Sequence, residues 1–287
     1  MLNDDMPYDL SLSRRDLIRT AAALPLAAAG ANAAAVDSAS GFHLGIASYT
    51  LRTLTRTKAI AALKDLDIKY VSIKDFHAKM KATPEEWAAA RKEFEDAGLT
   101  IASGGNVSFK SDKEEDIKFN FEYAKAMGFP IIVMAPALKN LPMIEKYCKQ
   151  YNIKAAIHNH GPEDKDFFPT PQSVLKEVKN MDPRMGLCID IGHTVRTGVD
   201  LLESIQMAGS RLHDMHVKDL KDFTKKESQC IVGYGAMPIT KVFRLLKKMK
   251  YTGGVMLEYE INQNEPIPGM RESISYLRGV ISGLTAA

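Results

Sequence analysis

The chain alternates short apolar segments with amphipathic ones, after an N-terminal stretch of different character. The apolar segments are rich in Val, Ile and Leu on both alternating faces, which is typical of parallel strands covered by helices. Eight such strands are expected, at His43–Thr50, Tyr70–Phe76, Thr100–Asn106, Ile131–Ala135, Lys154–His160, Met185–Ile191, Leu212–Lys218 and Gly254–Glu260.

Amphipathic segments separate these strands. Thr83-Pro84-Glu85-Glu86 is a capping box with proline at the first helical position, and it predicts a helix that runs to Gly98. Further helices are expected at 58–67, 112–127, 141–151, 170–180, 200–208, 238–250 and 268–282. Eight strand–helix units predict an α/β fold, a single (β/α)₈ TIM barrel over residues 42–284. An open doubly wound sheet is the alternative, but the glycine fingerprint that usually follows its first strand is absent.

The first 35 residues are predicted to lie outside this barrel. Arg14 and Arg15 precede an alanine-rich apolar stretch that runs from Thr20 to Ala31, and small residues suited to cleavage follow. This layout resembles a twin-arginine signal peptide, so the mature protein is expected to be exported to the periplasm. A disordered basic tail before a short apolar helix is the alternative. The stretch is too short for a convincing membrane span, so no membrane partner is expected for the mature form.

Composition narrows the class of protein. Of 287 residues, 45% are hydrophobic and 25% are charged, with a formal net charge of only +3, as in an ordinary soluble globular protein. No dense block of Lys and Arg appears, so no nucleic-acid partner is expected. The three cysteines are widely spaced and do not form a disulfide framework. Their spacing is compatible with an exported protein that folds before export.

Residues with metal-binding chemistry stand at the ends of the last four strands. They are His158, Asp190, His216 and Glu258. A parallel barrel brings the carboxyl ends of its strands together at one mouth. Two imidazoles and two carboxylates gathered there predict a divalent-metal site, with Mn²⁺ as the first choice and Zn²⁺, Co²⁺ or Fe²⁺ as alternatives. A buried salt bridge at the aspartate and hydrogen-bonded structural histidines are the other interpretations.

Five more polar residues are predicted to reach the same mouth. His193 follows Asp190 by three residues, and Lys74 follows the second strand as a catalytic candidate, although a surface lysine is an equal interpretation. His160, Lys218 and Glu260 each lie two residues beyond a predicted ligand and are expected to bind substrate. The longest irregular stretch, 220–237, also leaves this end of the barrel, and such loops are usually functional.

Three short motifs resemble the xylose-isomerase-like TIM-barrel superfamily. They are Asp-Ile-Gly-His at 190–193, His-Val-Lys-Asp at 216–219 and Leu-Glu-Tyr-Glu at 257–260. The superfamily includes sugar epimerases, hydroxypyruvate isomerase, inosose dehydratase and endonuclease IV. The resemblance implies that Asp190, His216 and Glu258 bind metal, that Glu258 is also catalytic, and that His193 binds substrate or assists proton transfer.

The sequence departs from the resemblance at the fifth strand. Many epimerases of the superfamily end that strand with a glutamate that binds metal and acts as a base, and this chain has His158 there. Glu163 stands near the superfamily's substrate-contacting acid and is therefore a catalytic candidate. The loss of the glutamate argues against epimerisation by two bases and leaves room for a lyase.

The first expectation is therefore a metal-dependent isomerase or epimerase of a small sugar or keto-sugar, which removes an alpha proton to give an enediolate. The alternative is a lyase or hydratase that eliminates a group from a 3-keto sugar or keto-glycoside. A non-catalytic sugar-binding barrel is a less favoured alternative. An endonuclease IV-like enzyme is also less favoured, because seven histidines are few for a multi-metal nuclease site. The expected partner is a small carbohydrate, and a homo-oligomer is compatible with the sequence.

Overall fold

The computed structural model describes residues 41–163 and 168–285. The predicted signal peptide, residues 1–35, lies outside the described residues. No helix in the described part of the chain combines the length and the apolar character that a membrane span requires.

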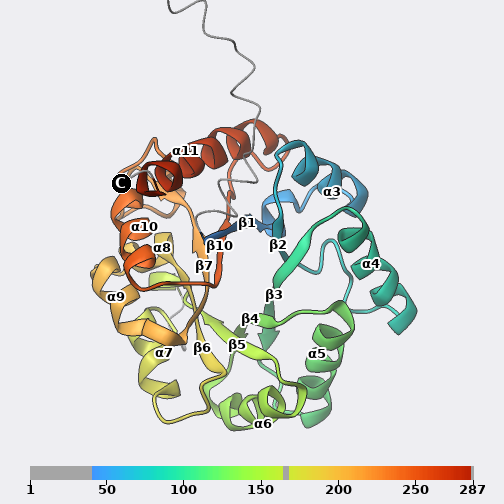
Figure 1. Cartoon of the computed structure of the whole chain (residues 1–287). Coiled ribbons are helices and arrows are strands. Elements are labelled where there is room, and N and C mark those ends of the chain that lie inside the picture. The colour runs from blue at the N-terminus through green and yellow to red at the C-terminus, as the bar shows by residue number, and fades with distance from the viewer. Residues whose placement is uncertain (1–40, 164–167, 286–287) are drawn as a thin grey trace, which may run out of the picture. The chain divides into compact units, whose positions relative to one another are not determined.

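Eight parallel strands form a closed barrel in the order β1-β10-β7-β6-β5-β4-β3-β2. The strands are β1 His43–Ala47, β2 Tyr70–Ile73, β3 Thr100–Phe109, β4 Ile131–Pro136, β5 Lys154–His158, β6 Met185–Asp190, β7 Leu212–Val217 and β10 Gly254–Leu257. Helices surround this ring of strands (Figure 1). The predicted (β/α)₈ barrel is confirmed.

The helices follow the strands in the expected alternation. They are α3 Arg56–Asp65, α4 Pro84–Asp96, α5 Glu114–Met127, α6 Leu141–Tyr151, α7 Pro171–Val178, α8 Ile191–Arg196, α9 Leu201–Ala208, α10 Ile239–Lys248 and α11 Ile267–Thr285. The predicted capping box is present, because the Thr83 side chain accepts from Glu86 N while the Glu86 side chain accepts from Thr83 N.

Two local features differ from the prediction, and both lie at the carboxyl end of the barrel. Helix α8 was not among the predicted helices; it starts directly after β6 because the Asp190 side chain caps it. The irregular stretch 220–237 contains most of a small antiparallel pair, β8 Asp219–Leu220 with β9 Gln229–Cys230. The Asp219 carboxylate accepts hydrogen bonds from the backbone N–H groups of Gly233, Gly235 and Met237, which orders this loop.

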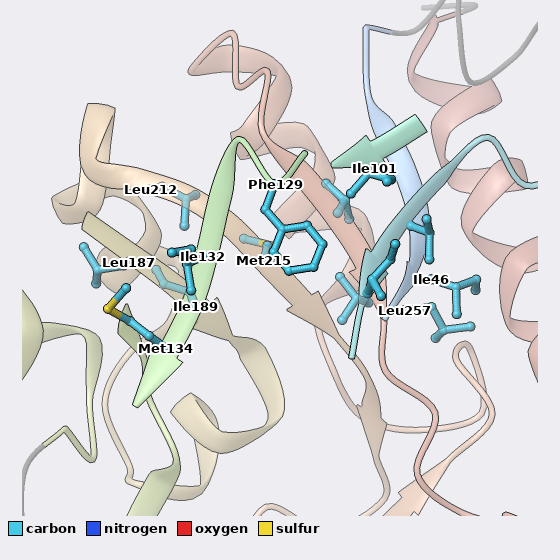
Figure 2. Packing of buried hydrophobic residues seen from close by; sticks show 14 of the residues in the cluster. Ile46, Ile101, Phe129, Ile132, Met134, Leu187, Ile189, Leu212, Met215 and Leu257 are labelled. Atoms are coloured by element: carbon cyan, nitrogen blue, oxygen red, sulfur yellow. The ribbon is translucent and has the colours of Figure 1, made fainter. Parts of the chain in front are cut away.

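The two faces of the strands pack in separate layers. Outward-facing residues such as Leu187, Ile189 and Met215 belong to the large core shared with the helices (Figure 2). Inside the ring, Val133, Ala156 and Cys188 form a small cluster of their own. Because strand side chains alternate, the residue two positions after each inward-facing one points inward at the carboxyl end. This rule places His158 above Ala156 and Asp190 above Cys188.

Candidate metal centre at the carboxyl end of the barrel

The four predicted ligands come from four neighbouring strands. Strands β5, β6, β7 and β10 are consecutive in the ring, and Asp190 is paired in register with His216. One ligand atom from each of His158, Asp190, His216 and Glu258 lies within 4.8 Å of all the others. All four residues are buried. The structure therefore brings together the set that the sequence proposed.

The spacing of these atoms fits a cation. His158 Nε2 lies 3.0 Å from His216 Nδ1 and 3.7 Å from Asp190 Oδ2, and His216 Nδ1 lies 3.3 Å from Glu258 Oε2. Ligand bonds of about 2.0–2.2 Å place neighbouring donors roughly 3.0–3.6 Å apart around a tetrahedral or octahedral ion. Asp190 Oδ2 is fully buried and has Lys218 Nζ 2.9 Å away as its charged partner. The fit to a metal ion therefore rests on the spacing of the four donors and on their chemistry, two imidazoles and two carboxylates.

The protonation states of the imidazoles differ. Burial and the neighbouring rings of His160 and His216 lower the pKa of His158 well below its usual value, so this imidazole is neutral and can ligate. Burial also opposes protonation of His216, but the Cys188 sulfur and Glu258 carboxylate raise its pKa well above the usual value. Because burial raises the pKa of Cys188 to about 12, the thiol keeps its proton and Glu258 supplies the charge. Metal binding at His216 therefore releases a proton.

The two carboxylate oxygens of Asp190 have different roles: one caps helix α8 and the other faces the candidate ligands. Asp190 Oδ1 accepts from His193 N at 2.8 Å and so caps α8. The Asp190 backbone N–H donates to Asn159 Oδ1 at 3.1 Å, and Asn159 in turn donates to Thr194 Oγ1 at 3.1 Å. These bonds fix the carboxylate, so Oδ2 is held toward the cluster before any ligand arrives. The same aspartate thereby positions His193 at the mouth.

Lys218 places an ammonium group against the same carboxylates. Its Nζ lies 2.9 Å from Asp190 Oδ2, 2.9 Å from Glu258 Oε2 and 2.5 Å from Glu260 Oε2. Burial opposes its charge, but these carboxylates raise the pKa of Lys218 well above the usual value. Burial also works against ionisation of Glu258, yet Lys218 and His216 lower the pKa of Glu258 well below its usual range. The metal-free site is thus held together by two protein cations.

A cavity of about 220 Å³ opens above the candidate ligands. Of the residues predicted to be catalytic or substrate-binding, five line it and Lys218 does not; the five are Lys74, His160, His193, Glu258 and Glu260. The sequence missed two further lining residues, Tyr49 and Asn106. The Asn106 side-chain amide lies 2.8 Å from His160 Nε2, and Lys74 Nζ donates to the Asn106 carbonyl.

Glu163 lies away from this cavity. It forms an ion pair with Arg196 and lines a second cavity next to the first, together with Lys218. Burial works against the ionised form, but the Arg196 hydrogen bond lowers the pKa of Glu163 below its usual value, so it stays a carboxylate. The structure therefore does not bring Glu163 to the candidate ligands. Neither Arg196 nor Tyr49 stood in a motif from which the sequence could have identified it.

Comparison with known proteins agrees with the barrel fold. A family model described as "Xylose isomerase-like TIM barrel" matches residues 60–280. An inosose dehydratase of Mesomycoplasma hyopneumoniae is 22% identical over 252 residues, covering 69% of this chain and 82% of the relative. An inosose isomerase of Halalkalibacterium halodurans is 21% identical over 185 residues, covering 55% of this chain and 65% of the relative. The crystal structure of IOLI protein with a binding zinc atom has a TM-score of 0.71 at 17% identity, covering 84% of this chain and 99% of that one.

Proposed function

Because the chain belongs to the xylose isomerase-like TIM barrel family, we propose that it is a divalent-metal-dependent enzyme that removes the proton next to the carbonyl of a keto-sugar. One observation carries the proposal: four buried donors from four strands converge within 4.8 Å at the mouth of the barrel. Curated relatives include an inosose dehydratase and an inosose isomerase, and both chemistries can start with removal of such a proton.

Four of the residues are suited by their charge and position to hold the metal ion. His158, Asp190, His216 and Glu258 would hold the cation, which when bound polarises a carbonyl and makes the adjacent C–H more acidic. Mn²⁺ and Zn²⁺ both suit two imidazoles with two carboxylates.

The imidazoles of His160 and His193, which line the 220 Å³ cavity, are the candidates for proton transfer. Burial lowers the pKa of His193, so at neutral pH its imidazole is free to accept a proton. Lys74, which lines the 220 Å³ cavity, supplies a donor for the sugar hydroxyls, whereas the Lys218 ammonium group is held by the carboxylates of Asp190, Glu258 and Glu260. A sugar in the 220 Å³ cavity would displace its water, which strengthens these contacts.

The fifth strand favours elimination over isomerisation. Epimerisation by two bases needs a proton acceptor on each face of the substrate carbon. The position where the family resemblance implies a carboxylate base holds His158, whose Nε2 faces the other candidate ligands. An imidazole in the ligand set leaves that face without a carboxylate base. Elimination needs only one base and an acid for the leaving oxygen.

The mass of the product separates the two outcomes. Purified protein loaded with Mn²⁺, Zn²⁺, Co²⁺ or Fe²⁺ is incubated with inososes, free ketohexoses and 3-keto sugars, and products are read by mass spectrometry. Isomerisation conserves mass, whereas elimination lowers it by one water or splits the substrate. If no sugar is turned over with any of the four candidate metals, the proposal is wrong.

We also propose that the protein is exported in folded form. The cysteines Cys148, Cys188 and Cys230 are all free and buried, so the fold needs no oxidising compartment to form. Fractionation of cells that express the full chain, with Arg14→Lys/Arg15→Lys as the matched variant, tests this. Export that does not depend on the two arginines contradicts it.

A further inference from the structure

A second, larger cavity continues from the inner one. The outer cavity measures about 470 Å³, against about 220 Å³ for the inner. The two share three lining residues, His160, His193 and Glu260. The groups suited to proton transfer therefore stand at the junction, between the candidate metal ligands and the outer space.

The outer cavity has ordered walls. Its lining includes Glu163, Arg196, Leu220 and Ile261, from four different segments of the chain. The loop after β7 is fastened to the end of β10, because the Gln229 side chain donates to Glu258 O at 2.7 Å and accepts from Glu260 N at 3.1 Å. The outer wall is thereby fixed to the residues that flank the candidate ligand Glu258.

Arg196 supplies a buried polar group to this cavity. Only 7% of its side chain is exposed, and it pairs with Glu163. Its Nη1 lies 3.5 Å from His193 Nδ1, while its Nε has no acceptor in the part of the chain that the structure describes. A buried guanidinium with a free donor suits an oxygen-rich ligand. The apolar side chains of Leu220 and Ile261 on the same wall suit the face of a ring.

The volumes indicate how much of a substrate each cavity holds. Sites for small molecules typically measure about 300–1,000 Å³. The inner cavity falls below that range, whereas the outer one lies within it. We propose that the substrate is a keto-glycoside, with the keto-sugar ring in the inner cavity and a ring-sized aglycone, joined through the glycosidic oxygen, in the outer cavity. This inference rests on the proposed function and names its substrate class.

The reaction balances without a further reactant. An imidazole at the junction takes the proton from the carbon next to the carbonyl, and that electron pair forms a double bond to the neighbouring carbon. The bond from that neighbouring carbon to the glycosidic oxygen breaks. The leaving oxygen then takes the proton from the imidazolium. The products are an unsaturated keto-sugar and the free alcohol, with no oxidation or reduction.

The test compares substrates that differ only in the aglycone. Metal-loaded protein is assayed with 3-keto-glucose and with the methyl and benzyl 3-keto-glucosides of both anomeric configurations, because methoxide and benzyloxide are similar leaving groups. We expect kcat/KM to be at least about tenfold higher for one benzyl glycoside than for the methyl glycoside and the free sugar, which corresponds to about 1.4 kcal/mol. Equal kcat/KM values for all three would overturn the inference while leaving the proposed function intact.

Variants that fill the outer cavity sharpen the test. Ile261→Trp narrows the outer cavity from its wall, and Lys226→Trp narrows it from its exposed rim. If Ile261→Trp fails to fold, Lys226→Trp still tests the inference. Each should reduce the preference for benzyl over methyl glycoside by about tenfold. Met207→Trp, at an exposed apolar position on α9, is the matched control and should keep the preference. An unchanged preference in both cavity variants contradicts the inference.

A binding measurement separates this inference from the proposed function. The unoxidised phenyl and methyl glucosides lack the carbonyl and serve as probes in calorimetry, with and without Mn²⁺. The phenyl glucoside should bind more tightly, and Lys226→Trp should remove the difference. If keto-sugars are not turned over but this difference is seen, the proposed function fails and the outer site stands. Equal binding of both probes contradicts the outer site.

Discussion

Two histidines three residues apart on β7 are both buried, yet they differ in protonation state and in the groups that surround them. His216 lies at the carboxyl end, 3.3 Å from Glu258, and its pKa is raised well above the usual value. His213 lies at the amino end, where burial and the nearby charge of Lys154 lower its pKa to about 4. It lines a cavity of about 510 Å³, larger than the one above the candidate ligands. Converging charged donors, rather than cavity volume, distinguish the end of the barrel that carries the candidate ligands.

The largest expected effect comes from removing a candidate ligand at the carboxyl end of the barrel. A separate variant of His213, at the amino end, serves as the comparison. His216→Ala should reduce metal affinity by at least about 100-fold and abolish turnover, because the remaining donors no longer enclose the ion. Asp190→Asn should behave in the same way. His213→Leu should keep full metal content. Metal analysis of the purified, folded variants checks this, and unchanged stoichiometry in His216→Ala and Asp190→Asn would exclude these residues as ligands.

The next largest effect is expected from removing the ammonium group of Lys218. Lys218→Met retains the apolar stem and removes the ammonium group that faces Asp190 and Glu258. Loss of one partner from a buried ion pair costs about 3–5 kcal/mol, so the metal-free variant should unfold at a clearly lower temperature. Added Mn²⁺ should raise its Tm more than that of the wild type, since the ion replaces the missing charge. Equal metal-induced shifts would show that Lys218 does not stabilise the carboxylates.

The difference in pH-dependent stability between wild type and His213→Leu reports on the amino end of the barrel. The folded state keeps His213 neutral down to about pH 4, whereas the unfolded chain protonates it near pH 6.5. The unfolded state therefore binds more protons between these values, and stability falls by about 3 kcal/mol as pH is lowered through this window. Denaturant unfolding of wild type and His213→Leu should show curves that diverge only below about pH 6.5. Parallel curves would contradict the lowered pKa.

The smallest effect concerns the glycine beneath Lys218. A Cβ at Gly192 would lie 2.6 Å from Lys218 Cγ and 2.7 Å from its Cδ, so Gly192→Ala should push the stem aside at a cost of about 1–3 kcal/mol. Its counterpart at the other end is Gly186→Ala, where a Cβ would lie 2.3 Å from the Arg211 backbone oxygen and 2.4 Å from the His213 ring. The first should alter metal affinity and the second only stability, as measured by calorimetry and thermal unfolding. Identical effects on metal affinity would mean that the two ends are not independent.

Much of this site could be predicted because alternation along a strand is a local property. Apolar runs identified the strands, and polar residues at their ends identified the mouth, so His158, Asp190, His216 and Glu258 could be proposed together. The start of α8 could have been predicted as well, since Asp190 caps it from the adjoining position. Arg196 and Tyr49 could not, because nothing in their neighbouring residues indicates which cavity they line.

The sequence by itself therefore determined the barrel and the chemistry of its candidate ligands, because both depend on periodicity and residue type within a few positions. Tertiary structure alone decided which groups face one another. Lys218 meets Asp190 and Glu258, Glu163 turns to Arg196, and the loop after β7 joins β10 to form a second cavity. Those contacts join segments far apart along the chain, and only closure of the ring brings them within reach.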